Sequence, residues 1–189
     1  MQKNSCKTNW NVKTMVFMAL VVAMHLVLTR VFVIELGPYR ISLGSVCTIL
    51  GGLWLGPAAG ALCGLSSDIL GCFMRGYTID PFITLAAVMW GVIPALFKPM
   101  YADKTKKMKT VGISVSIFIA AIISSLVLTT TGLTVIDGYN FYAIIPGRLV
   151  QFVILVPIYC VVTSFLYFSP LTQMVSENVA QGALKKKIV

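Results

Sequence analysis

The sequence predicts an all-α integral membrane protein with six transmembrane helices, on the evidence of its composition and the placement of its charges. Of its 189 residues, 58% are hydrophobic and 11% are charged, whereas soluble domains average about 45–50% apolar and about 25% charged residues. A helix that crosses a bilayer needs about 20 mainly apolar residues, so the chain has room for about five to seven crossings. We therefore expect residues 1–189 to form a single membrane domain.

Charged residues bound five long apolar runs, and a break in the second run adds a sixth helix. That run contains Gly56-Pro57, a pair that can end one helix and begin the next. In order, the predicted helices are 14–35, 41–55, 57–74, 80–98, 110–131 and 146–168. The second helix spans only about 22 Å at about 1.5 Å per residue, so a re-entrant hairpin over residues 41–75 is an alternative to two full crossings.

The eleven lysines set the orientation of these helices, because they form only three clusters: Lys3, Lys7 and Lys13; Lys98, Lys104, Lys106, Lys107 and Lys109; and Lys185, Lys186 and Lys187. The positive-inside rule places all three clusters in the cytoplasm, which requires an even number of crossings between neighbouring clusters. Four crossings before the second cluster and two after it satisfy this condition. Both termini are then cytoplasmic.

All four arginines fall on the opposite, external side: Arg30, Arg40, Arg75 and Arg148. The orientation rule does not ask for this separation, because either basic residue can act as an inside signal. The planar guanidinium grips a carboxylate or phosphate with two parallel hydrogen bonds, which lysine cannot do. The arginines therefore predict an anionic ligand that enters from outside. As an alternative, Arg30 pairs with Glu35, Arg75 pairs with Asp80, and the other arginines reach lipid headgroups.

Two of the arginines stand beside predicted helix starts, where a cation is unfavourable. Arg148 follows Pro146-Gly147 in the first turn of the last predicted helix, and Arg40 precedes the second. A helix N-terminus carries about half a positive charge, so a bound anion would relieve both side chains.

Asp68 is the acidic residue predicted to lie deepest in the apolar layer, about eleven residues beyond Pro57. A carboxylate there costs several kcal/mol unless it is paired or hydrogen-bonded. It either forms a structural ion pair with an arginine or accepts hydrogen bonds from the N–H groups of a heterocyclic ligand. Tyr77 and Tyr139 lie near the outer ends of helices, where they either stack on a planar ligand or belong to an interfacial aromatic belt.

Nothing in the sequence indicates catalysis, and we expect no catalytic residue, metal or cofactor in this chain. His25 is the one histidine, no H-E-x-x-H, D-D-x-x-D or C-x-x-C motif occurs, and no phosphate-binding G-x-x-x-x-G-K-[ST] loop is present. A membrane-embedded enzyme is therefore disfavoured, and any ATP must be hydrolysed by another chain. An ion-coupled small-solute transporter is a second alternative, which internal repeats or a chain of intramembrane acids would favour. We expect no nucleic-acid partner.

Several motifs in a fixed order resemble the substrate-binding S components of energy-coupling factor (ECF) vitamin transporters, most closely the folate-specific subfamily. They are Arg40-Ile41-Ser42-Leu43-Gly44, the segment from Gly51 to Ala61 with its Gly-Pro break, the segment from Gly64 through Asp68 to Gly71, and Ile145-Pro146-Gly147-Arg148. Ala19 and Ala23 form an A-x-x-x-A motif, a feature in which such S components resemble one another. The threonine-rich stretch 129–137 departs from the folate subfamily, which keeps another vitamin open as the substrate.

The resemblance implies a six-helix subunit of the bacterial plasma membrane that captures folate from outside. It also implies a transmembrane T component and two cytoplasmic ATPases as partners. Folate carries two carboxylates that suit the arginines and a pterin edge that suits Asp68. Ala19 and Ala23 lie one turn apart on the first helix, so they either form a groove for a partner or pack within this subunit.

Overall fold

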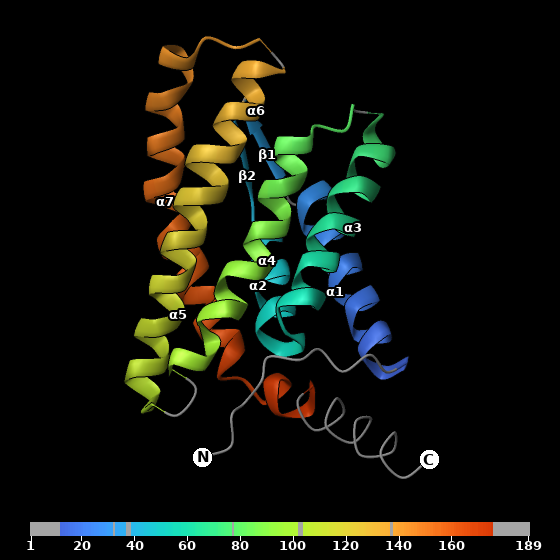
Figure 1. Ribbon diagram of the computed structural model, residues 1–189, viewed down its shortest axis with the longest axis vertical. Helices are drawn as coiled ribbons and strands as arrows, with labels where there is room; N and C mark the ends of the chain where they lie inside the picture. Colours follow the sequence, from blue (N-terminus) through green and yellow to red (C-terminus); the bar gives the residue numbers. More distant parts are fainter. Residues whose placement is uncertain are drawn as a thin grey trace.

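The structure, a computed structural model, is a bundle of helices that run up and down its long axis (Figure 1). It describes residues 12–31, 33–36, 39–76, 78–101, 104–136 and 138–175. The elements are α1 (Val12–Arg30), β1 (Val33–Leu36), β2 (Tyr39–Ser42), α2 (Gly44–Leu55), α3 (Pro57–Arg75), α4 (Pro81–Tyr101), α5 (Lys106–Ala121), the π-helix η1 (Ile122–Thr129), α6 (Thr130–Val135) and α7 (Phe141–Tyr167).

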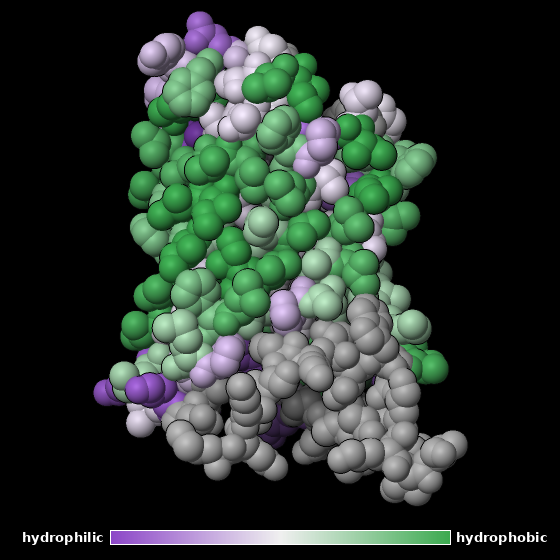
Figure 2. Space-filling model, in the orientation of Figure 1, coloured by the Kyte–Doolittle hydropathy of each residue, from purple (hydrophilic) through white to green (hydrophobic). Residues whose placement is uncertain are grey.

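Within these residues, five helices are long and apolar enough to cross a membrane, and α2 is a shorter apolar helix. Helices α5, η1 and α6 form one continuous helix over Lys106–Val135. The predicted, mostly helical membrane fold is confirmed. Figure 2 shows a broad apolar surface around the middle of the molecule with hydrophilic residues toward its ends, as a bilayer requires.

The first predicted helix is wrong at its end, because α1 stops at Arg30 rather than at residue 35. The chain continues into an antiparallel hairpin in which Val33 pairs with Ser42 and Glu35 with Arg40. Val33 and Ile34 are β-branched, which suits a strand. The prediction of an all-α chain is therefore corrected at this hairpin.

Helix α2 lies at the centre of the bundle, and ten of its twelve residues are buried. It packs against α1, α3, α4 and α7. His25 on α1 is hydrogen-bonded to Thr48 on α2, with 2.8 Å between Nδ1 and Oγ1. The predicted break after α2 is present: Gly56 has φ 98°, which favours glycine, and Pro57 begins α3.

Glycines bring α2 and α3 into backbone contact with α4. A Cβ atom on Gly52 would lie 2.0 Å from the carbonyl oxygen of Gly91, and one on Gly91 would lie 2.3 Å from that of Gly60. No side chain fits at these positions. The three helices therefore form a rigid contact, which we call the glycine contact (Gly52, Gly60, Gly64 and Gly91).

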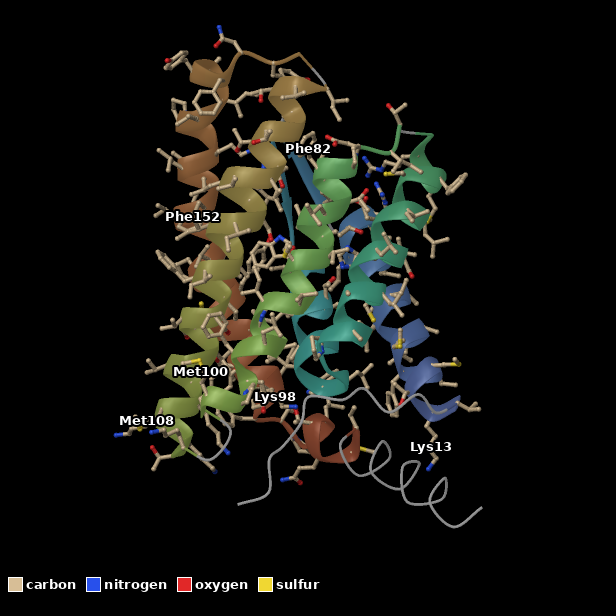
Figure 3. The ribbon with its side chains drawn as sticks, in the orientation of Figure 1. Lys13, Phe82, Lys98, Met100, Met108 and Phe152 are labelled. Atoms are coloured by element: carbon tan, nitrogen blue, oxygen red, sulfur yellow. The ribbon has the colours of Figure 1, made fainter. Side chains whose placement is uncertain are left out.

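The described lysines of the first two clusters lie at one end of the bundle. Figure 3 labels Lys13, Lys98 and Met108 toward that end, which also contains the junction of α2 and α3. Lys98 Nζ donates a hydrogen bond of 2.5 Å to the carbonyl oxygen of Leu53 in the last turn of α2. A cation is favourable there, because the C-terminal carbonyls of a helix carry partial negative charge.

Candidate binding site

A polar cavity of about 130 Å³ lies where β2 and α2 meet α4, η1 and α7. Hydroxyl, amide and guanidinium groups project into it from most of these elements, together with three large aromatic side chains. Its lining residues are Ser42, Ser45, Trp90, Ala121, Ser125, Thr129, Arg148, Gln151, Phe152, Leu155, Val156 and Tyr159. We call it the Arg148 cavity.

Arg148 supplies the only charged side chain among the lining residues of this cavity, and only 6% of it is exposed. A buried cation needs polar surroundings, because an apolar environment does not solvate its charge. The cavity places this cation beside open volume and among hydroxyl and amide groups, which suits an anionic group of a ligand.

Helix α7 positions Arg148 differently from the prediction. Its N-cap is Asn140, whose side-chain oxygen accepts a hydrogen bond of 3.1 Å from Tyr142 N. The helix therefore begins at Phe141, and Pro146 lies inside it rather than at its start. Arg148 is in the second turn of α7. The prediction that this arginine stands in the first turn, at the positively charged N-terminus of the helix, is therefore wrong.

Tyr159 fixes the wall of the cavity between α7 and β2. Its hydroxyl donates a hydrogen bond of 2.8 Å to the carbonyl oxygen of Ser42. Its ring meets Trp90 of α4 edge to face, with 5.5 Å between the ring centroids. These two contacts connect three elements around one buried side chain.

The opposite wall is the π-helix η1, in which Ser125 and Thr129 line the cavity. π-Helices are rare and often occur at functional sites. Thr129 Oγ1 donates to the carbonyl oxygen of Ser124, five residues earlier, at 2.8 Å. This side-chain bond accompanies the wider turn.

Asp68 lies in a different place, at the contact between α3 and α4. Thr84 Oγ1 donates a hydrogen bond of 2.6 Å to Asp68 Oδ2. The guanidinium of Arg30 lies against Gly71, one turn farther along α3. Asp68 is part of α3, and the guanidinium of Arg30 lies beside this helix. Neither residue lines the Arg148 cavity.

The other predicted ligand residues are dispersed. Arg75 is half-buried in the last turn of α3, and Tyr139 is 46% exposed in the connection before α7. The backbone of Arg40 is part of β2, so it does not precede α2 directly as predicted; its side chain, like Tyr77, is outside the described residues. Among the seven predicted residues, the described part of the structure brings only Arg148 to the cavity.

Sequence reasoning missed the neutral lining of the cavity. Arg148, Gln151 and Tyr159 follow one another on one face of α7, at spacings of three and eight residues. Projection of the helix from Arg148 would have found them. The residues from β2, α2 and η1 are brought there by tertiary packing, for which no local signal exists.

Ala19 and Ala23 are exposed on the outer face of α1. Their exposed neighbours on this helix include Val16, Leu20 and Val27, whereas only Thr14 and Val21 are buried. The two alanines therefore do not pack against other described helices of this chain. Their surroundings form an apolar surface that is open to the bilayer or to a partner.

Comparison with known proteins agrees with this architecture. The sequence model of the family described as "ECF transporter, substrate-specific component" matches residues 13–180. The folate transporter FolT of Clostridium novyi (strain NT) is 27% identical over 158 residues, which cover 80% of this chain and 86% of that protein.

Two solved structures share the fold. The crystal structure of FolT bound with folic acid superposes with a TM-score of 0.71 at 24% identity, over 83% of this chain and 93% of that one. The S component of a bacterial ECF transporter gives 0.62 at 19% identity, over 82% and 93% of the two chains. The matched family consists of components of transporters rather than of enzymes. The chain belongs to the family of substrate-specific components of ECF transporters, and it is a multi-pass protein of the bacterial plasma membrane.

Proposed function

We propose that this chain binds folate on the outside of the cell and delivers it to the cytoplasm together with a T component and two ATPases. The observation that carries the proposal is the buried Arg148 beside a cavity lined by hydroxyl and amide groups. The similarity to FolT of Clostridium novyi, and to the solved FolT with folic acid, supports folate over other vitamins.

The chemistry of the lining suits a ligand with one acidic and one aromatic end. The glutamyl tail of folate carries two carboxylates, and the guanidinium of Arg148 can hold one of them with two hydrogen bonds. Trp90 and Tyr159 offer aromatic surface for the pterin. The cavity of about 130 Å³ is smaller than the roughly 300–1,000 Å³ of typical ligand pockets. The proposal therefore requires that the elements around the cavity move apart when folate binds.

Six crossings with both termini in the cytoplasm agree with the geometry. Helix α2 has twelve residues and a length of about 18 Å, and β2 adds about 13 Å. In series they match the roughly 30 Å of a bilayer core. A strand within the membrane is acceptable where protein surrounds it, and β2 pairs with β1 and packs on α7. Lys13 and Lys98 lie at the end that we assign to the cytoplasm.

A panel of vitamins tests the substrate. A ligand that binds only the folded chain raises its free energy of unfolding by about 2.7 kcal/mol at a concentration of 100 times Kd. The melting temperature rises as a result. We expect folate or a reduced folate to raise the melting temperature of the purified chain without partners. If folates leave it unchanged and another vitamin raises it, the chain is an S component for that other vitamin.

Docking of the T component is proposed to use the exposed apolar surface at Ala19 and Ala23. Replacement of Ala23 by Trp adds bulk to this exposed surface, away from the Arg148 cavity, so we expect folate binding by the isolated chain to persist. Co-purification of the T component and ATP-driven uptake should be lost. Val161→Trp on the exposed face of α7 is the control, since it adds the same bulk elsewhere. Normal uptake by Ala23→Trp would contradict this docking site.

A further inference from the structure

A second hollow, distinct from the Arg148 cavity, runs along the outer surface between α5 and α7. It is a groove of about 480 Å³, lined mainly by Val115, Phe118, Val153, Val156 and Pro157. This volume falls in the roughly 300–1,000 Å³ range of pockets that hold small molecules. Val153 is 68% exposed, so the groove opens to the surroundings of the bundle and not to its core.

The groove is closed at one end by two aromatic rings. Phe118 of α5 meets Phe152 of α7 edge to face, with 5.6 Å between the ring centroids. Toward the other end, Cys160 Sγ donates to the carbonyl oxygen of Ser114 at 3.9 Å, so this thiol is directed to the backbone of α5. The open walls are therefore almost entirely hydrocarbon.

Basic residues lie at the start of α5, about two helical turns before the groove. Lys104, Lys106 and Lys107 are exposed, and no acidic residue occurs in the first turn of α5. Figure 2 shows hydrophilic side chains gathered at this end, and Figure 3 labels Met108 there, well below Phe152. The lysines thus lie on the side of the groove that faces this end of the bundle.

One face of α5 joins these two features. Lys107, Val111, Val115 and Phe118 follow one another at spacings of four, four and three residues, which places them on the same face. The helix rises about 16 Å from Lys107 to Phe118 at about 1.5 Å per residue. This distance is close to half of the roughly 30 Å hydrocarbon core, which is the depth of one leaflet.

We infer that the groove holds one acyl chain of an anionic phospholipid whose phosphate is bound by Lys104, Lys106 and Lys107. The charge at the base of the groove selects the headgroup, since clusters of lysines next to a membrane helix attract anionic lipids. The apolar walls above it receive the chain for the depth of one leaflet. The groove and the Arg148 cavity share Phe152 and Val156 as lining residues, but the inference does not depend on which vitamin the cavity binds.

Native mass spectrometry of the delipidated full chain in detergent tests the site. Phosphatidylglycerol and phosphatidylcholine with identical acyl chains are added in competition, and glycerol 3-phosphate is added in a separate sample. We expect saturable binding of one phosphatidylglycerol, with preference over phosphatidylcholine and no displacement by glycerol 3-phosphate. Equal retention of both lipids would overturn the inference, and so would displacement by the soluble phosphate.

Two matched pairs of variants locate the lipid. Lys104→Gln/Lys106→Gln/Lys107→Gln should reduce the preference for phosphatidylglycerol by about fivefold or more per lysine, whereas the equal charge change Lys185→Gln/Lys186→Gln/Lys187→Gln should not. Val153→Trp fills the groove and should abolish the bound lipid, whereas Val161→Trp, at 69% exposure on the same helix, should retain it. A melting temperature within error of the unmodified chain establishes that each variant is folded.

The same variants distinguish a lipid from a protein in the groove. If Val153→Trp leaves the lipid bound, the groove is not its site. If Val153→Trp instead prevents co-purification of the T component and no lipid is retained by the unmodified chain, the occupant is a helix of that partner. Either result contradicts the inference.

Discussion

The Arg148 cavity and the contact between α3 and α4 both contain a charged side chain within the bundle, but the two charges have different neighbours. Arg148 faces open volume lined by hydroxyl and amide groups. Asp68 is bonded to Thr84, close to the glycine contact, where the backbones leave no room for a Cβ atom. A charge within the membrane thus indicates a ligand where a polar cavity adjoins it. Where a polar group lies across a helix interface, that group can explain the charge.

The largest expected effect comes from adding a side chain within the glycine contact, where the backbones leave no space for one. Gly91→Ala would place a methyl group 2.3 Å from the carbonyl oxygen of Gly60, a backbone atom that cannot turn away. Overpacking of this kind costs about 1–3 kcal/mol or more. The gain in helix propensity from Gly to Ala is only about 1 kcal/mol. We expect a lower melting temperature and a smaller yield of monodisperse protein.

Ala58→Leu is the control for this variant, because Ala58 is exposed on α3 and added bulk meets no backbone there. It should leave the melting temperature nearly unchanged. If Gly91→Ala melts like the unmodified chain, α3 and α4 can separate easily. The two regions would then not differ in rigidity.

The cavity should respond in the opposite way, with a loss of binding rather than of folding. Arg148→Ala removes a charge-assisted hydrogen bond worth about 1.5–3 kcal/mol, so folate should bind about ten- to a hundredfold more weakly. A pterin that lacks the glutamyl tail should lose much less. Titration calorimetry on protein with an unchanged melting curve measures both affinities.

Arg148→Lys refines this test, because lysine keeps the charge but offers no planar fork. We expect its affinity for folate to lie between those of Arg148→Ala and the unmodified chain. Equal losses for folate and for the tail-less pterin would assign Arg148 to the pterin end or to the shape of the cavity.

Local patterns account for what the sequence predicts well. Long apolar runs and the Gly56-Pro57 break each act within a short stretch of the chain. They predict five long apolar spans and the short α2. The hairpin of β1 and β2 was missed because Val31, Phe32, Val33 and Ile34 extend the apolar run of the first helix in the sequence.

The cavity could be predicted only in part. Arg148 stands out because charges are rare in apolar segments, whereas serine and threonine are common in membrane helices and carry no such signal. Ser45 and Thr129 line the same cavity although 84 positions separate them in the chain. The π-helical turns that direct Ser125 and Thr129 inward are a property of packing and were not expected.

The smallest expected effect concerns Asp68, and it decides whether the contact between α3 and α4 is structural. The hydrogen bond from Thr84 is short, and both residues are half-buried. Asp68→Asn and Thr84→Val should each lower the free energy of unfolding by about 0.5–1.5 kcal/mol, because the first weakens and the second removes a hydrogen bond between half-buried groups. Their effects should not add: a double-mutant cycle on melting curves should give a coupling energy of at least about 0.5 kcal/mol. Folate affinity should stay within about twofold in all three variants, because Asp68 does not line the Arg148 cavity.

The prediction from sequence was different, namely that Asp68 accepts hydrogen bonds from the pterin. If Asp68→Asn weakens folate strongly while Thr84→Val does not, that role is correct, and the bound ligand extends from the cavity to α3.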